Sequence, residues 1–210
     1  MPTPPDIYTE PEDIDPDTLA HLGPLAPLAG TWEGEGVDLH PVREGTGEAR
    51  YQERLELACI DPQPNGPQLL YGLRYHQHIL RAGEANTFHD QVGYWLWDAA
   101  AGFVYQSLAI PRAQVALAMG RASPGDRAFT LRAERGATTA GICSGPFLDE
   151  AFRTLEYTIT IRVNADGTLA YEQDTLLQII GRDELFHHTD RNTLRRVAPP
   201  APNPASLLRE

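Results

Sequence analysis

The chain has 210 residues and a formal net charge of −12, from 29 acidic and 17 basic residues, and every basic residue is Arg. An acidic chain without Lys argues against proteins that bind nucleic acid or anionic membranes, because both need cationic patches. The apolar content of 41% and the length suit one domain with its own core. We therefore expect a small-molecule ligand as partner, no nucleic acid and no membrane, in a monomer or homodimer.

Residues 1–20 form an acidic, Pro-rich leader that we expect to be flexible. It lacks the basic and apolar regions of a signal peptide, and no apolar run reaches the ~18 residues of a membrane span. These features predict a cytoplasmic protein. Near the end of the leader, Asp17 is expected to cap one helical turn that ends at Gly23-Pro24 and covers one end of the domain.

Residues 30–36 read Gly-Thr-Trp-Glu-Gly-Glu-Gly and begin the first predicted strand. Gly34 and Gly36 share a face with Trp32, because side chains alternate along a strand. A strand that lacks two side chains on one face either bends sharply or is approached closely at its backbone. On the residues alone we favour a strand that opens a barrel at a corner, with Trp32 buried.

Apolar and polar residues alternate through most of the chain that follows, which predicts half-buried antiparallel strands. No helix of ordinary length is expected, which leaves a sandwich or a barrel. About ten strands with mostly short loops favour an all-β, antiparallel, up-and-down barrel of the lipocalin kind over residues 21–197. A Pro-rich, flexible tail is expected over residues 198–210. The predicted strands are 49–60, 69–80, 88–97, 102–110, 113–119, 129–132, 155–162, 168–180 and 185–197, with turns at 63–66, 98–102, 123–126 and 164–167.

Two cysteines, Cys59 and Cys143, match no metal or redox spacing, and we expect a pair of free, buried thiols. His76 and His78 share one face of a strand, a spacing that suits a metal pair. That face also carries Arg74, which favours a solvated outer surface instead. His21 and His40 are expected to be exposed, and the pattern around His89 fits a core or a pocket position.

His187 and His188 are adjacent in the last predicted strand, so their side chains point to opposite faces. His188 shares a face with Phe186 and Leu194, which predicts that His188 points into the barrel. It is then either a structural histidine, satisfied by Asp190 and Asn192 on the same face, or a ligand. No catalytic triad, nucleophile elbow or phosphate-binding loop is present, and no catalytic residue is predicted.

The stretch 30–36 resembles the Gly-x-Trp-x-Gly-x-Gly motif of nitrobindin-like proteins, a family of haem-binding β-barrels similar to fatty-acid-binding proteins. Residues 93–97 and 108–112 support the resemblance, and His188 followed by Leu194 and Arg196 is similar to the last strand of the family. The resemblance covers about residues 22–197. It implies a ten-stranded barrel with haem b in one mouth and an apolar distal side.

Carried to this chain, the resemblance implies that His188 ligates the ferric iron, with His187 as the second choice, and that Thr31, Trp32 and Gly34 lie at the haem. The implied activity is nitric oxide binding, peroxynitrite isomerisation to nitrate, or both. A haem-free barrel that carries a small apolar or amphipathic ligand is the alternative. A barrel with a structural or partner-binding role is a third reading, because the fold alone does not decide among them.

Overall fold

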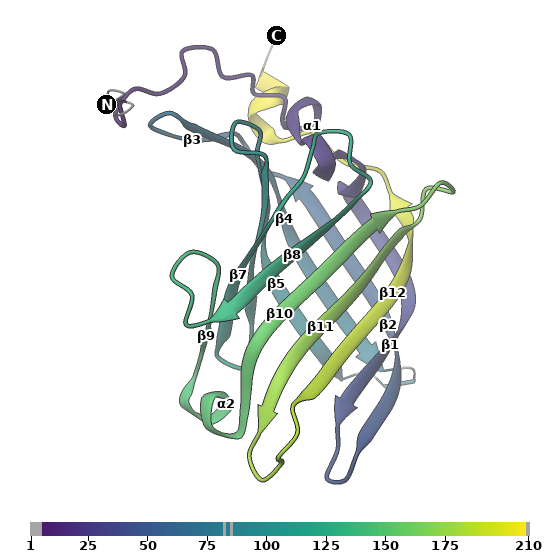
Figure 1. The fold of residues 1–210 in the computed structure, drawn as a ribbon. Coiled ribbons are helices and arrows are strands. Elements are labelled where there is room, and N and C mark those ends of the chain that lie inside the picture. The colour runs from purple at the N-terminus through teal and green to yellow at the C-terminus, as the bar shows by residue number, and fades with distance from the viewer. Residues whose placement is uncertain (1–5, 82, 85, 209–210) are drawn as a thin grey trace.

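A computed structural model describes residues 6–81, 83–84 and 86–208. Residues 1–5 and 209–210 of the predicted leader and tail lie outside this part. The strands form one twelve-stranded sheet, which closes into a barrel because β2 also pairs with β4 (Figure 1). The elements are α1 (Thr18–His21), η1 (Gly23–Leu28), β1 (Gly30–Pro41), β2 (Thr46–Cys59), β3 (Gln63–Asn65), β4 (Gln68–Arg81), β5 (Thr87–Asp98), β6 (Phe103–Ile110), β7 (Gln114–Arg121), β8 (Ala128–Arg135), β9 (Gly141–Ser144), α2 (Pro146–Ala151), β10 (Phe152–Val163), β11 (Leu169–Ile179), β12 (Phe186–Ala198) and η2 (Pro204–Leu208).

The prediction of an all-β barrel is confirmed, and every predicted strand is present. The ring runs β2-β1-β12-β11-β10-β8-β9-β7-β6-β5-β4 and back to β2, which makes eleven strands, with β3 attached outside it at β4. The pairing is not strictly antiparallel, since β8 and β9 run parallel. Neither β9 nor α2 was predicted, because segments this short show no clear periodicity. Residues 63–65, predicted as part of a turn, form the short strand β3.

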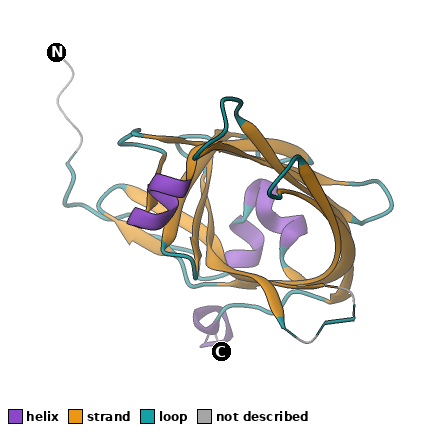
Figure 2. Ribbon diagram, turned by 90° about the horizontal axis from the view of Figure 1, so that it is seen from below, coloured by secondary structure: helices purple, strands orange, loops and turns teal. Residues whose placement is uncertain are grey.

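The segment α1–η1 covers one end of the barrel, as predicted. Asp17 accepts a hydrogen bond from the backbone N–H of Ala20 and caps α1. Leu22, Leu25 and Leu28 are buried in the core beneath this segment. Figure 2 looks into the barrel from the other end, and the helices of the α1–η1 segment are seen through the ring of strands. The burial of three leucines stabilises the cover by the removal of apolar surface from water.

The leader and the tail contact each other through Asn203, whose side chain is fully buried. Its Nδ2 donates hydrogen bonds to the backbone oxygen of Pro16, at 2.8 Å, and to Asp61 Oδ1, at 2.7 Å. Its Oδ1 accepts one from the backbone N–H of Thr18, at 3.1 Å. The domain boundaries at residues 20/21 and 197/198 stay a prediction. No helix in the described part of the chain is long and apolar enough to cross a membrane.

The glycine-rich start of β1 meets neighbouring chain rather than an open space. Gly30 has a φ of +124°, a conformation that L side chains rarely adopt, and the register with β12 shifts between Thr31 and Trp32. These two features place a bend where a corner was predicted. At Gly36 a Cβ would overlap the ring of Tyr51. Gly36 therefore makes room for a tyrosine of the barrel, and not for a flat ligand.

Candidate functional site

A cavity of about 380 Å³ lies at the end of the barrel opposite the α1–η1 cover. Its outer part is lined by apolar side chains, among them Phe88, Phe147 and Phe152, and by Arg112. Its inner part is polar, with the buried side chains of Gln77, Gln91, Tyr157 and Tyr171 and the half-buried Gln173 on the wall. The volume lies within the range of about 300–1,000 Å³ that is usual for small-molecule sites. The cavity thus offers an apolar mouth and a polar floor to one ligand.

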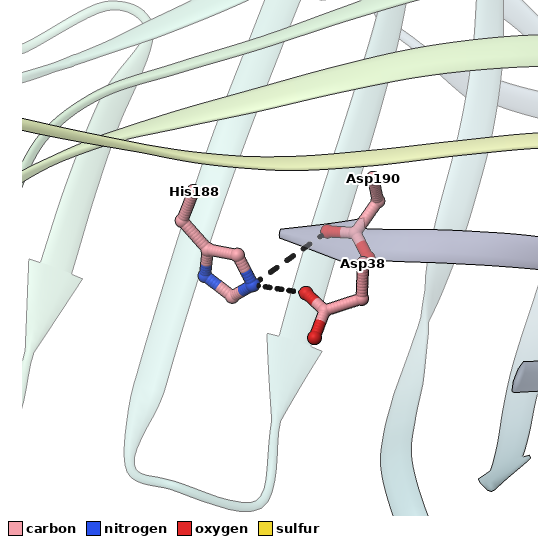
Figure 3. Close-up of side chains that lie close together, drawn as sticks. All are labelled: Asp38, His188 and Asp190. Atoms are coloured by element: carbon pink, nitrogen blue, oxygen red, sulfur yellow. Dashed lines mark hydrogen bonds and ion pairs between the residues drawn. The ribbon is translucent and has the colours of Figure 1, made fainter. Parts of the chain in front are cut away.

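His188, near the start of β12, lines this cavity and contacts Asp38 of β1 (Figure 3). Its Nε2–H donates a hydrogen bond of 2.6 Å to Asp38 Oδ1. The Asp38 side chain is 1% exposed and that of His188 is 33% exposed. Nε2 is the ring atom engaged by protein, and within the described part of the chain Nδ1 of His188 has no hydrogen-bond partner.

The pKa values of this pair move in opposite directions, as expected for a hydrogen-bonded ion pair. Burial alone would raise the pKa of Asp38, but the hydrogen bond and charge of His188, with those of His40, outweigh it and hold the pKa below its ordinary value. Burial alone would lower the pKa of His188, but the hydrogen bond to Asp38 and the charge of Asp190 raise it above its ordinary value. The geometry therefore favours a carboxylate beside a hydrogen-bonded imidazole.

Asp190 completes a cluster of three side chains at the cavity wall. It is the register partner of Asp38 across β1 and β12, so the two carboxyl groups lie side by side. Its Oδ2 is 3.9 Å from His188 Nε2 and accepts a hydrogen bond from Gln173. Burial and the nearby charges of Asp38 and Glu53 raise the pKa of Asp190 to about 7, although the charge of His188 lowers it. Ligand atoms of the three side chains lie within 4.8 Å of one another.

His40 was expected to be exposed, and this prediction is wrong. His40 lines the cavity and donates from Nδ1 to Asp38 Oδ2 at 2.6 Å. It is on the same face of β1 as Asp38, and both side chains line the cavity. His40 and His188 therefore each donate a hydrogen bond to a different oxygen of the Asp38 carboxylate.

His89, near the start of β5, lines the same cavity, in agreement with the pocket alternative. Burial is the main cause that lowers the pKa of His89, and the charges of His188 and Arg112 act in the same direction. Burial of His89 therefore favours the neutral form of its imidazole.

Behind the cavity, Glu53 is 3% exposed and faces inward. It accepts hydrogen bonds from Tyr171 Oη at 2.7 Å, Gln77 Nε2 at 2.8 Å and Asn192 Nδ2 at 2.7 Å. Burial raises the pKa of Glu53, although these three hydrogen bonds lower it. Glu53 and its three hydrogen-bond donors therefore form the polar, buried inner end of the cavity.

The remaining histidines lie outside the cavity. His187 points outward, is 64% exposed and hydrogen-bonds Asp174 at 2.7 Å. His76 and His78 are on the outer face, where His76 contacts Asp90 and His78 contacts Thr87, in agreement with the solvated alternative. His21 is exposed and stacks on Tyr71. The orientation predicted for the adjacent pair, with His188 inward, therefore agrees with the structure.

Thr31, Trp32 and Gly34 are not brought together with His188. Trp32 is fully buried, donates from Nε1 to the backbone oxygen of Leu28 at 2.8 Å, and has the guanidinium of Arg196 4.5 Å from its ring centroid. Gly34 packs against Thr193 and Leu194 of β12. These residues lie toward the covered end of the barrel and none of them lines the cavity. The geometry gives no support to a ligand contact by these three.

Both cysteines are free, but the prediction that both are buried is wrong, because Cys143 is exposed on β9. Cys59 is half-buried, and burial is the main cause that raises its pKa to about 11. Neither thiol belongs to the cluster at His188.

Sequence reasoning missed Asp38 and Glu53. The alternation of side chains contained a signal for each residue. Asp38 is an even number of positions from Trp32 in β1 and therefore shares its inward face. In the same way, Glu53 shares the inward face of Tyr51 and Leu55 in β2. The pairing of Asp38 with His188 had no local signal.

The residues of the cavity fit a haem group in three respects. Imidazole nitrogen is a good ligand for haem iron, and the imidazole of His188 lines the cavity. The aromatic residues of the outer part suit an apolar macrocycle. Arg112 at the mouth supplies a cation for a carboxylate group.

Comparison with known proteins supports the same class. A model of the family described as "THAP4-like, heme-binding beta-barrel domain" matches residues 21–196. The crystal structure of Rv2717c from M. tuberculosis has a TM-score of 0.59 and 22% sequence identity, over 88% of this chain and 99% of that chain. At this identity the likeness shows the fold alone. None of the curated proteins matches the chain.

Proposed function

Because the chain belongs to the family of THAP4-like, haem-binding β-barrel domains, we propose that its cavity holds haem b with His188 as the axial ligand of ferric iron. The family membership confirms the resemblance to nitrobindin-like proteins, since the match covers nearly all of the predicted domain. The observation that carries the proposal is the imidazole of His188, which lines the cavity from the last strand of the barrel.

The side chains of the cavity have separate roles in this proposal. His188 provides the nitrogen donor, and Arg112 binds a propionate at the mouth. Phe88, Phe147 and Phe152 contact the macrocycle and exclude water from it. When bound, the haem would supply the iron for nitric oxide binding, for isomerisation of peroxynitrite to nitrate, or for both.

Titration of the purified protein with hemin tests this function. The wild type is expected to develop a Soret band at one hemin per chain, and His188→Ala to lose the ligated spectrum. His187→Ala is the matched control, because the neighbouring imidazole points outward and should leave the spectrum unchanged. The proposal fails when the wild type shows no Soret shift, or when both variants behave alike.

A second candidate function rests on the division of the cavity into an apolar mouth and a polar floor. This arrangement suits a small amphipathic ligand in a haem-free barrel, with its polar end at Gln77, Gln91 and Tyr171. Native mass spectrometry of protein purified without added hemin separates the two functions. A mass increase that matches haem supports the first, and an organic adduct of other mass supports the second.

A further inference from the structure

We propose that Asp38, His188 and Asp190 bind a divalent transition-metal ion of the Zn²⁺ class at the wall of the cavity. The ligand atoms are Nε2 of His188 and one oxygen of each carboxylate. The inference goes beyond the proposed function and does not depend on it, because the ion binds in protein that holds no haem.

The ligand atoms of the three side chains surround one point. Asp38 and Asp190 are register partners on neighbouring strands, so their carboxyl groups stand at the same level of the inner face (Figure 3). Nε2 of His188 is 2.6 Å from Asp38 Oδ1 and 3.9 Å from Asp190 Oδ2. A tetrahedral ion with bonds of about 2.0–2.1 Å holds its ligand atoms about 3.3 Å apart. One observed distance is shorter than this and the other is longer, so side-chain shifts of less than about 1 Å admit the ion.

The donor set of one imidazole nitrogen and two carboxylate oxygens selects the kind of ion. Imidazole suits Zn²⁺ and related transition metals, whereas Mg²⁺ and Ca²⁺ are bound by oxygen ligands. Two carboxylates balance the charge of a divalent ion. In the protonated ring of His188, the proton of Nε2 passes to solvent when the ion takes its place beside Asp38, and Nδ1 keeps its own proton.

Outer contacts hold both carboxyl groups in place. The Asp38 side chain is 1% exposed, and its second oxygen accepts a hydrogen bond of 2.6 Å from His40. The Asp190 side chain is 16% exposed and accepts a hydrogen bond of 3.3 Å from Gln173. Contacts of this kind orient the ligands of metal sites and support their affinity.

The cavity gives the ion a way in and an open coordination position. All three side chains of the cluster line the cavity. Three protein ligands with a fourth position left open is the arrangement of catalytic zinc sites, whereas structural sites are closed by four protein ligands. The fourth position therefore faces a small molecule that enters through the mouth.

The outer surface carries two histidine contacts that serve as references. His187 and Asp174 lie 2.7 Å apart, with side chains 64% and 41% exposed. His76 and His78 have ring centroids 6.0 Å apart, and His76 contacts Asp90 at 3.0 Å. Among the residues that the structure describes, neither contact belongs to a group of three side chains with ligand atoms as close as those of the cluster.

The deciding experiment is an isothermal titration of hemin-free protein with zinc chloride. The wild type is expected to bind one Zn²⁺ per chain. Asp190→Asn is expected to lose more than about 100-fold in affinity, because it removes a ligand, whereas loss of an outer contact costs about 10–100-fold. His40→Phe removes an outer contact only and is expected to lose about 10–100-fold. Asp174→Asn removes the same charge from the outer surface and is expected to keep the affinity of the wild type.

Two results overturn the inference. The first is no zinc binding by the wild type, or equal affinities of Asp190→Asn and Asp174→Asn. The second is binding that is lost in His78→Ala and kept in Asp190→Asn, which places the ion on the outer face. If Asp190→Asn does not fold, His188→Ala and its control His187→Ala decide in the same way. The titration contains no hemin, so its failure leaves the proposed function standing, and the absence of a Soret band in the hemin titration leaves the metal site standing.

Discussion

His188 Nε2 and Asp38 Oδ1 lie 2.6 Å apart, although the two residues are separated by 150 positions in the sequence. The contact exists because β1 and β12 are neighbours in the closed barrel, with Asp38 opposite Asp190. It joins the first and the last strand of the ring at the wall of the cavity. It also decides which ring nitrogen of His188 is engaged by protein, and no stretch of local sequence contains this property.

Stability should fall with rising pH because of Glu53. Burial raises its pKa above the ordinary value of 4.5 in the folded state. This contribution to the free energy of unfolding is therefore fully present below about pH 4.5 and is lost as the pH rises toward the folded-state pKa. In urea unfolding, Glu53→Gln should gain stability relative to the wild type as the pH rises. Glu48→Gln, on the exposed surface, is the control. The prediction is contradicted when the difference in free energy of unfolding between Glu53→Gln and wild type does not change with pH.

Trp32→Phe should destabilise the protein without an effect on hemin binding. The change leaves the buried backbone oxygen of Leu28 without its donor and weakens the contact with Arg196. We expect a loss of about 1–3 kcal/mol in the free energy of unfolding. Hemin titration of the folded variant should give the wild-type affinity, because Trp32 does not line the cavity. A selective loss of hemin binding would show that the residue contacts the ligand.

Gly36→Ala should destabilise the barrel by about 1–3 kcal/mol, the usual effect of overpacking. The added Cβ would overlap the ring of Tyr51, whose hydroxyl is hydrogen-bonded to that of Tyr171 at 2.9 Å. Thermal unfolding measures the loss. Gly125→Ala is the matched control, since nothing lies within 4 Å of its added Cβ. Equal melting temperatures for the two variants would mean that Tyr51 moves aside without cost.

Asn203→Ala should loosen the contact between the leader and the tail. The change removes three hydrogen bonds and leaves the backbone oxygen of Pro16 and Asp61 Oδ1 without this donor. We expect a loss of about 1–3 kcal/mol and faster proteolysis at both ends of the chain. Asn65→Ala, at an exposed position on β3, should show neither effect. Unchanged proteolysis in Asn203→Ala would show that other contacts hold the two segments.

Arg112→Ala should weaken hemin binding if the mouth binds a propionate. An ion pair at an exposed position contributes about 0.2–1 kcal/mol, which corresponds to at most about a fivefold rise in the dissociation constant. The effect should decrease at high salt, because exposed pairs are screened. Arg74→Ala, on the outer face of β4, controls for the loss of one positive charge. Identical affinities for both variants at low salt would exclude a role for Arg112.

Alternation of side chains predicted most of the strands and their inward faces. As expected, the buried side chains of β2 include Tyr51, Leu55 and Leu57. The Pro-rich composition of the tail did not suggest that Asn203 would be buried. The short elements β9 and α2 had no counterpart in the prediction, because four to six residues are too few for a period to be recognised. Their positions depend on contacts with β7 and β10, which are distant along the chain.

The sequence by itself determined that the chain is an all-β barrel with one covered end, and that His188 points inward while His187 points outward. Only the tertiary structure decided that Asp38 and His40 join His188 at one cavity, and that Trp32 and Gly34 lie elsewhere. The physical reason is that the period of two assigns a side chain to a face of the sheet, whereas its neighbours on that face depend on strand order and register. Both are set by closure of the barrel, which brings β1 beside β12.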